Sequence, residues 1–293
     1  MNRQRAADAA LVWNTVIWGS TFVLVKAALA GISPVLFLAL RFSLATAALL
    51  ALFRGARKGP WSWRSVGAGA LTGTFLFSGY LFQTLGLQYT SAPKSAFITG
   101  LMSVMVPLLA MAVYRSRPRV SEVAGIIVAT VGMGLMTLEG SVGSISRGDL
   151  LTFFCAVGFA AHIVTLGHFS EYVSFEVLSV SQIAAAAVWS LLLFPWMETP
   201  RVEWRPMVMC AILVTGLLAT ALAFTIQAWA QRFTSSTRTA LIYLLEPVFA
   251  WLTSYFLMGE GLSGRAAAGA GLILSGVVLV EVKPLNPWFH PSK

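Results

Sequence analysis

The sequence F-Q-T-L-G-L-Q-Y-T-S-A-P-K-S-A-F-I, from Phe82 to Ile98, returns in altered form as I-Q-A-W-A-Q-R-F-T-S-S-T-R-T-A-L-I, from Ile226 to Ile242. At a constant offset of 144 residues, identical or similar residues align: Gln83 with Gln227, Thr90 with Thr234, Lys94 with Arg238, and Ile98 with Ile242. A proline follows each copy, Pro107 and Pro247, at an offset of 140. The difference of four residues is about one helical turn. The chain is therefore predicted to consist of two related halves, residues 1–141 and 142–293.

The composition is that of a membrane protein. Hydrophobic residues make up 57% of the 293 residues and charged residues only 11%, whereas charged residues supply about a quarter of a typical soluble domain. Mean hydropathy is +0.78. The net charge of +9 comes from short basic clusters between apolar stretches, which indicate membrane topology and not nucleic-acid binding. The two cysteines have neither metal-ligand spacing nor a disulfide pattern, and we expect no cofactor or metal.

Ten apolar stretches of about 17 to 25 residues have the length that a helix needs to cross the bilayer. Uninterrupted apolar runs of this length exclude a β-barrel, so we expect an all-α integral membrane protein. The stretches are Ala9–Ala28, Pro34–Phe53, Ser65–Leu87, Lys94–Tyr114, Glu122–Leu138, Asp149–Gly167, Phe175–Trp196, Pro206–Ala230, Thr237–Met258 and Gly264–Val282.

Lysines and arginines in the loops and at the ends of these stretches collect on one predicted side of the membrane, 12 against 4. The positive-inside rule then places both termini in the cytoplasm, and we expect the inner cell membrane as the location. Each half holds five spans, an odd number, so a second copy must enter the membrane from the opposite side. This predicts two inverted five-helix repeats, the plan of many secondary transporters, and alternating access to a site between the halves.

Four motifs in order resemble the drug/metabolite transporter superfamily, specifically its ten-span EamA type. The motifs are W-G-S-T-F-V-L-V-K (Trp18–Lys26), L-R-F-S-L-A (Leu40–Ala45), A-L-I-Y-L-L-E-P-V-F-A-W-L (Ala240–Leu252) and L-M-G-E-G-L-S (Leu257–Ser263). The resemblance covers nearly the whole chain. It implies transport of a small molecule, since similar proteins include exporters of amino acids, other metabolites and drugs, and some importers.

Charged residues inside predicted spans are candidate site residues, because a charge is costly in the bilayer and usually faces the protein interior. Arg41 is predicted either to contact a substrate carboxylate or act as a gate, or to bond backbone carbonyls and hold helices together. Lys94 is either an anion-attracting group at a cavity mouth or an interfacial anchor. Its counterpart Arg238 would place a second cation at the other mouth.

Two titratable residues are candidates for coupling transport to protons. Glu246 directly precedes Pro247, which frees a backbone carbonyl one turn earlier, and the prolines are predicted to break spans four and nine. His162 lies in the middle of span six. For both residues a structural role as a hydrogen-bonded partner remains an open alternative.

Aromatic and amide side chains on several spans are predicted to line an apolar cavity with a few polar groups. Ordinary packing is the alternative for each one taken singly. These candidates are Trp18, Tyr80, Gln83, Gln227, Trp229 and Tyr243. Glycines in spans three, five and ten recur at near-helical spacing, and they predict close helix packing or a homodimer face.

These observations favour a secondary transporter. A membrane enzyme would show clustered histidine or carboxylate motifs, a receptor or channel would show a sensor domain or filter-like loop, and an ATP-driven pump would carry a P-loop; the sequence has none of them. Basic groups near one vestibule together with aromatic residues suit an amphipathic zwitterion. We therefore expect export of neutral or aromatic amino acids or related metabolites, with efflux of hydrophobic drug-like compounds as the alternative.

Overall fold

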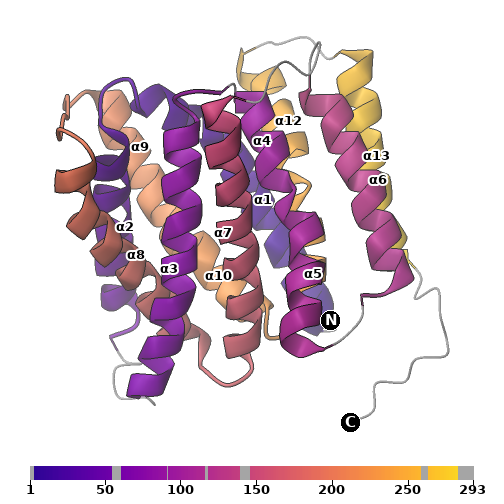
Figure 1. Ribbon diagram of the computed structural model, residues 1–293, viewed down its shortest axis with the longest axis horizontal. Helices are drawn as coiled ribbons and strands as arrows, with labels where there is room; N and C mark the ends of the chain where they lie inside the picture. Colours follow the sequence, from indigo (N-terminus) through magenta and orange to yellow (C-terminus); the bar gives the residue numbers. More distant parts are fainter. Residues whose placement is uncertain are drawn as a thin grey trace.

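The computed structural model describes residues 3–54, 61–90, 92–115, 118–138, 146–258 and 263–282. These residues are almost entirely helical, and the one extended pairing among them is an isolated bridge between Ile32 and Val202. The helices form an elongated bundle with roughly parallel axes (Figure 1). They are α1 (Arg3–Ala28), α2 (Pro34–Leu52), α3 (Trp63–Gly86), α4 (Ala92–Gly100), α5 (Met102–Tyr114), α6 (Val120–Thr137), α7 (Arg147–Ser170), α8 (Phe175–Met197), α9 (Pro206–Gly216), α10 (Ala223–Ala230), α11 (Ser236–Tyr243), α12 (Glu246–Met258) and α13 (Gly264–Val282), with a π-helical segment, η2 (Leu217–Leu222), joining α9 to α10.

Seven helical stretches in the described part of the chain are long and apolar enough to cross a membrane. Two further apolar helices, Val120–Met136 and Gly264–Val280, are shorter, and the predicted ninth span is divided between α11 and α12. The predicted all-helical membrane class is thus confirmed. The count of ten spans remains a prediction.

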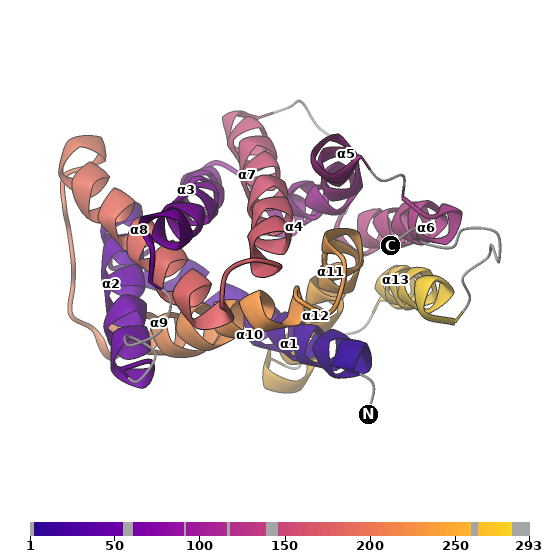
Figure 2. The ribbon, with the colours of Figure 1, turned by 90° about the horizontal axis from the view of Figure 1, so that it is seen from below.

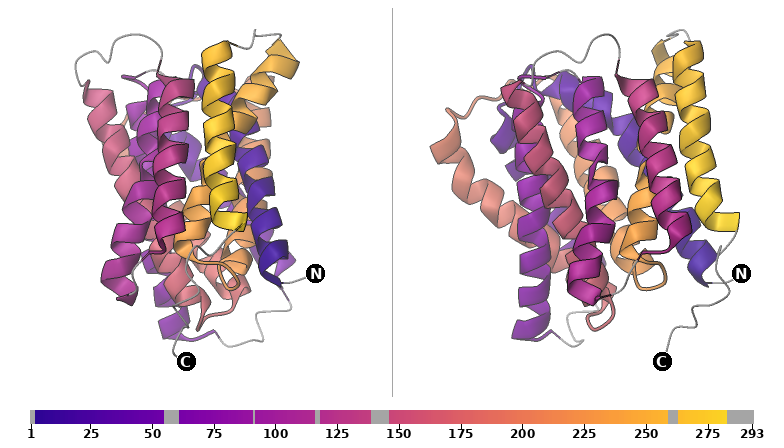
Figure 3. Two further views of the ribbon diagram at one scale, coloured as in Figure 1. Left: turned by 90° about the vertical axis from the view of Figure 1, so that its right-hand side faces the viewer. Right: turned by 45° about the vertical axis from the view of Figure 1, so that its right-hand side comes forward.

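Helices of the first half pack mainly on helices of the second half. Two pairs lie at opposite edges of the bundle, α6 beside α13 and α2 beside α8 (Figure 2). Between these edges α3 packs on α7, and α1 packs on α9, α10 and α12. The start of α1 and the end of α13 lie at the same end of the molecule (Figure 3).

Glycines allow the tightest of these contacts. A Cβ atom added to Gly132 of α6 would lie 2.6 Å from the carbonyl oxygen of Gly269 in α13, and one added to Gly125 would lie 2.6 Å from that of Gly276. The backbones of α6 and α13 therefore touch at two levels. The close packing predicted from these glycines occurs within the chain, and a homodimer stays a prediction.

Two predicted spans are interrupted near their middle, and the interruptions correspond in the two halves. Helix α4 ends at Gly100 and α5 begins after Leu101, while α11 ends at Tyr243 and α12 begins after Leu245. Leu101 and Leu245 are 144 residues apart, the offset that relates the two halves. The break before Pro247 lies where it was predicted. The predicted break at Pro107 is wrong, because Pro107 lies inside α5 and the break comes six residues earlier, after a glycine with low helix propensity.

Candidate functional site

A cavity of about 80 Å³ lies between the two halves, near the middle of the bundle. Side chains from α1, α2, α3, α4, α5, α7, α10, α11 and α12 line it, so it is built by both halves. Eight predicted site residues come together here: Trp18, Arg41, Tyr80, Gln83, His162, Gln227, Tyr243 and Glu246.

Arg41 is the buried cation of this cavity, with 3% of its surface exposed. Its Nε atom donates to Thr220 Oγ1 at 2.6 Å, and one terminal nitrogen donates to Tyr80 Oη at 3.1 Å. The guanidinium also lies 4.4 Å from the centroid of the Tyr80 ring, which is cation–π geometry. Within the described ranges no carboxylate pairs with Arg41. The protein thus fixes the position of a buried positive charge and leaves it without a counter-ion.

The π-helical segment η2 supplies the acceptors that hold Arg41. A π-helical turn shifts the backbone hydrogen-bond pattern and is often found at functional sites. The carbonyl oxygen of Ala219 accepts from the indole nitrogen of Trp18 at 2.9 Å and from Arg41 at 3.3 Å. This carbonyl and the Thr220 hydroxyl therefore join α1 and α2 to the second half of the chain.

Aromatic rings form one wall of the cavity. Trp18 packs edge-on against Tyr243 with ring centroids 4.9 Å apart, and it lies 5.3 Å from Phe224. Tyr80 packs edge-on against Phe159 at 5.1 Å. Edge-to-face contacts at these distances fix ring orientation, so the rings form a rigid apolar surface beside the charged groups.

Glu246 is the carboxylate of the cavity, placed at the first residue of α12 by the break in the ninth span. The carboxylate accepts no hydrogen bond and forms no ion pair with any described residue. It also borders a second, largely apolar cavity of about 220 Å³ that contains Met133, Leu244 and Trp251. A Cβ atom on Gly19 would lie 2.8 Å from the backbone oxygen of Glu246, so the glycine of the W-G-S motif lets α1 approach this break.

Gln83, His162 and Gln227 add amide and imidazole groups to the polar lining. The Nε2 atom of His162 lies 2.9 Å from Gln182 Oε1, and its ring packs edge-on against Phe224 at 5.5 Å. Gln227 Nε2 donates to Gln231 Oε1 at 3.1 Å. The predicted structural role of His162 as a hydrogen-bonded residue therefore has a partner, Gln182. Gln182 aligns with Arg41 at an offset of 141.

Two predicted site residues are not among these lining residues. Trp229 is partly buried and packs against Phe233, with ring centroids 5.5 Å apart. Lys94 lies in α4, but its side chain is outside the part of the structure described.

The structure adds lining residues that sequence reasoning did not select, chiefly Phe159, Phe224 and Thr99. Phe159 could have been found, because it aligns with Trp18 at the offset of 141 that relates Arg41 to Gln182. Phe224 and Thr99 could have been found in the same way, because they align with Tyr80 and Tyr243 at the offset of 144. The role of Thr220 as an acceptor for Arg41 depends on the π-helical segment, which its sequence L-L-A-T-A-L does not indicate.

Several apolar helices arranged around a buried, partly charged cavity define a multi-pass membrane protein of the transporter class. Residues 6–138 and 146–282 each match the model of the EamA-like transporter family. The chain therefore belongs to the EamA-like transporter family, and the resemblance seen in the sequence motifs is confirmed.

Relatives and a solved structure agree with this assignment. An uncharacterized transporter of Archaeoglobus fulgidus is 34% identical over 94% of this chain and 86% of its own length. A probable terminal-alkyne amino-acid exporter of Streptantibioticus cattleyicolor is 26% identical over 94% of both chains. A solved crystal structure has the same fold, with a TM-score of 0.79, 21% identity, and coverage of 94% of this chain and 96% of that one.

Proposed function

We propose that this transporter works by alternating access, with ten spans in two inverted five-helix repeats, residues 1–141 and 142–293. The pattern of contacts supports the inverted arrangement. Helix α1, the first of its half, packs on α9 and α10, which form the third span of the second half. Its counterpart α7, the first helix of the second half, packs on α3, the third span of the first half. The matching breaks at Leu101 and Leu245 support it as well.

The proposed cargo is a neutral or aromatic amino acid or a related amphipathic metabolite. The observation that carries this proposal is the pair of opposite charges that line one cavity without pairing with each other, Arg41 and Glu246. A cargo carboxylate on Arg41 would offset the cost of burying the guanidinium, and a cargo ammonium would do the same for Glu246. The aromatic wall formed by Trp18 and Tyr243 suits an apolar side chain.

Export is the proposed direction, in line with the name of the Streptantibioticus relative, a probable amino-acid exporter. We also propose that both termini lie in the cytoplasm and that the chain resides in the inner membrane. Glu246 and His162 are the proposed groups for coupling to protons, since both line the cavity that the cargo would occupy.

Efflux of a hydrophobic drug-like compound is the second candidate. It is favoured by the apolar cavity next to the first, in which Met133 and Trp251 lie beside Glu246. A compound without a carboxylate would contact the aromatic wall and have no need of Arg41.

The deciding experiment is a transport screen with purified protein in proteoliposomes, using labelled amino acids with and without an imposed pH gradient. Saturable transport of one amino-acid class that is lost in Arg41→Gln supports the proposal. The matched control is Arg201→Gln, in an exposed loop where the guanidinium bonds only a backbone oxygen. Silence across all amino acids, together with transport of a lipophilic cation or dye that Arg41→Gln leaves unchanged, would replace amino-acid export with drug efflux.

A further inference from the structure

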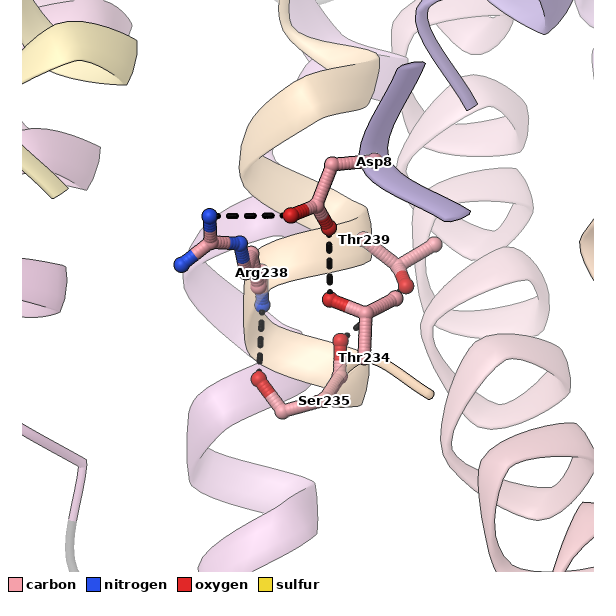
Figure 4. A network of polar contacts seen from close by, with 5 residues as sticks. All are labelled: Asp8, Thr234, Ser235, Arg238 and Thr239. Atoms are coloured by element: carbon pink, nitrogen blue, oxygen red, sulfur yellow. Dashed lines mark hydrogen bonds and ion pairs between the residues drawn. The ribbon is translucent and has the colours of Figure 1, made fainter. Parts of the chain in front are cut away.

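Asp8 ties the beginning of α1 to the beginning of α11 (Figure 4). One carboxylate oxygen lies 2.9 Å from the Arg238 guanidinium, and the other accepts a hydrogen bond from the Thr234 hydroxyl at 2.9 Å. Only 10% of the Asp8 side chain and 15% of the Arg238 side chain are exposed. A charge pair that is so little exposed is weakly screened by solvent, and separating the two helices would leave each buried charge without its partner.

The hydrogen bond from a threonine to an aspartate occurs a second time, in the other half. Asp149 in the first turn of α7 accepts a hydrogen bond from the Thr90 hydroxyl at 2.7 Å, directly before α4. Asp149 is 141 residues after Asp8, and Thr234 is 144 residues after Thr90. These are the offsets that relate Arg41 to Gln182 and Gln83 to Gln227, so the two contacts are counterparts.

Each contact joins the first helix of one half to the fourth helix of the other half. We name them the Asp8 latch (Asp8, Thr234 and Arg238) and the Asp149 latch (Asp149 and Thr90). They lie at opposite ends of the bundle, because α1 starts at one end and α3 reaches the other end just before Thr90 (Figure 1).

A layer of hydrogen bonds separates the Asp8 latch from the central cavity. Gln231 Nε2 donates to the Ile163 carbonyl at 3.0 Å, and the Tyr114 hydroxyl donates to the Val164 carbonyl at 2.9 Å. A polar cavity of about 560 Å³ lies on the outer side of this layer and is lined by Tyr114, Gln231 and Arg238. Gln231 borders this outer cavity and bonds Gln227 and Ile163, which line the central one, so it lies between the two cavities.

At the opposite end the residue that corresponds to Gln231 is Leu87, 144 residues earlier. Leu87 lines the central cavity itself. The Asp149 latch lies close by, since Thr90 follows Leu87 by three residues. Both latches are therefore placed where the path between the central cavity and one end of the molecule has to open.

We propose that Asp8 and Asp149 anchor the two gates of the transporter. Opening one end requires release of one latch, which lets the first helix of one half move away from the fourth helix of the other. The latch at the opposite end stays closed and keeps the cavity sealed there. Both latches are formed in this structure. This inference rests on the proposed alternating access, but it needs no knowledge of the cargo.

The test measures how fast a cysteine in the cavity reacts with a membrane-impermeant maleimide from each side. Thr99→Cys supplies the target, because Thr99 lines the central cavity, in a background where both native cysteines, Cys155 and Cys210, are alanine. Membrane vesicles of the two orientations present one end or the other to the reagent. Each variant is also assayed by thermal unfolding so that only folded protein is compared.

We expect Thr234→Val to raise the labelling rate only from the end where α1 begins, and Thr90→Val only from the opposite end. Each change removes a hydrogen bond to a carboxylate and keeps the shape of the side chain, so the expected increase is on the order of tenfold. The controls are Glu171→Gln and Glu203→Gln, which alter partly exposed acidic residues near the two ends outside the latches.

Asp8→Asn should raise the labelling rate from the same end as Thr234→Val does. The double variant Asp8→Arg, Arg238→Asp exchanges the two charges, so its labelling should be slower than that of Asp8→Asn. Faster labelling from the same end in both threonine variants would overturn the proposal, as would unchanged rates in both with the protein folded. Labelling requires no transported molecule, so a failed cargo screen and a failed gate test remain distinguishable.

Discussion

Arg41 has the structural role that was one of its two predicted interpretations, and its place in the cavity leaves the other, contact with the cargo, as a prediction. A lone arginine in an apolar stretch predicts a buried, functional charge, and its 3% exposure agrees with that. It bonds a backbone carbonyl and a hydroxyl in η2, as the structural interpretation required, and it also lines the cavity. The sequence could identify Arg41 but not Thr220, because an acceptor 179 residues away is chosen by packing and not by local pattern.

If Arg41 binds the cargo carboxylate, Arg41→Gln removes a charge-assisted hydrogen bond made to the cargo. Such bonds are worth about 1.5–3 kcal/mol, so KM for an amino acid should rise on the order of tenfold to a hundredfold. KM for the corresponding amine, which lacks the carboxylate, should be nearly the same in the wild type and in Arg41→Gln. Comparable losses for amine and amino acid would show that Arg41 supports the fold of the cavity and not cargo recognition.

Glu246 is expected to govern any dependence of transport on a pH gradient. Its carboxylate has no partner among the described residues, and Arg41, Tyr80, His162 and Tyr243 share its cavity. Glu246→Gln cannot exchange a proton, so transport by this variant should proceed down the cargo gradient at a rate that an imposed pH gradient does not change. Proteoliposomes with the gradient in either direction test this, and His162→Gln is the companion variant. Concentrative, gradient-dependent transport by Glu246→Gln would exclude the carboxylate from coupling.

At the scale of single elements, the interruptions were partly predictable. Proline signals an interruption because it removes a backbone donor. In the ninth span the break lies just before Pro247, and Pro247 lies in the first turn of the new helix, where proline is tolerated. In the fourth span α5 continues through Pro107, and the break lies at Leu101. The two breaks correspond to each other at the repeat offset of 144, but only the break in the ninth span lies beside its proline.

Helix α13 offers a matched test of close packing. A Cβ atom on Gly276 would lie 2.5 Å from the Gly125 carbonyl oxygen, whereas one on Gly271 would meet nothing within 4 Å. Gly276→Val should therefore force α6 and α13 apart and cost about 1–3 kcal/mol, as overpacking does. Gly271→Val, on the same helix, should leave stability nearly unchanged. Thermal unfolding in detergent measures both, and equal midpoints would mean that the α6–α13 contact does not limit stability.

At the scale of the whole molecule, the sequence predicted the helical membrane class and the family, because both depend on composition and on ordered motifs. The meeting of eight candidate residues in one cavity also agrees with the prediction of a site between the halves. The partners within that cavity, such as His162 with Gln182, depend on the packing of α7 against α8. No periodicity in either segment determines which pair of side chains will meet.

The inverted arrangement leads to a prediction about topology. Five spans in the first half would place the boundary at residue 141 on the opposite side of the membrane from the N-terminus, and five more would bring the chain back. The 12-to-4 distribution of basic residues predicts that the N-terminal side is cytoplasmic. Alkaline phosphatase, which is active only outside the cytoplasm, should therefore be active when fused after residue 141.

The same enzyme should be inactive when fused after residue 117, between α5 and α6, and after residue 282, the end of α13. A green fluorescent protein at these two positions should fluoresce, which confirms that the inactive fusions are made and folded. Phosphatase activity after both residue 141 and residue 282 would mean that the second half does not return the chain to its starting side. Because an inverted repeat requires an odd number of spans in each half, that result would overturn the two-half plan and, with it, the proposed pair of opposed gates.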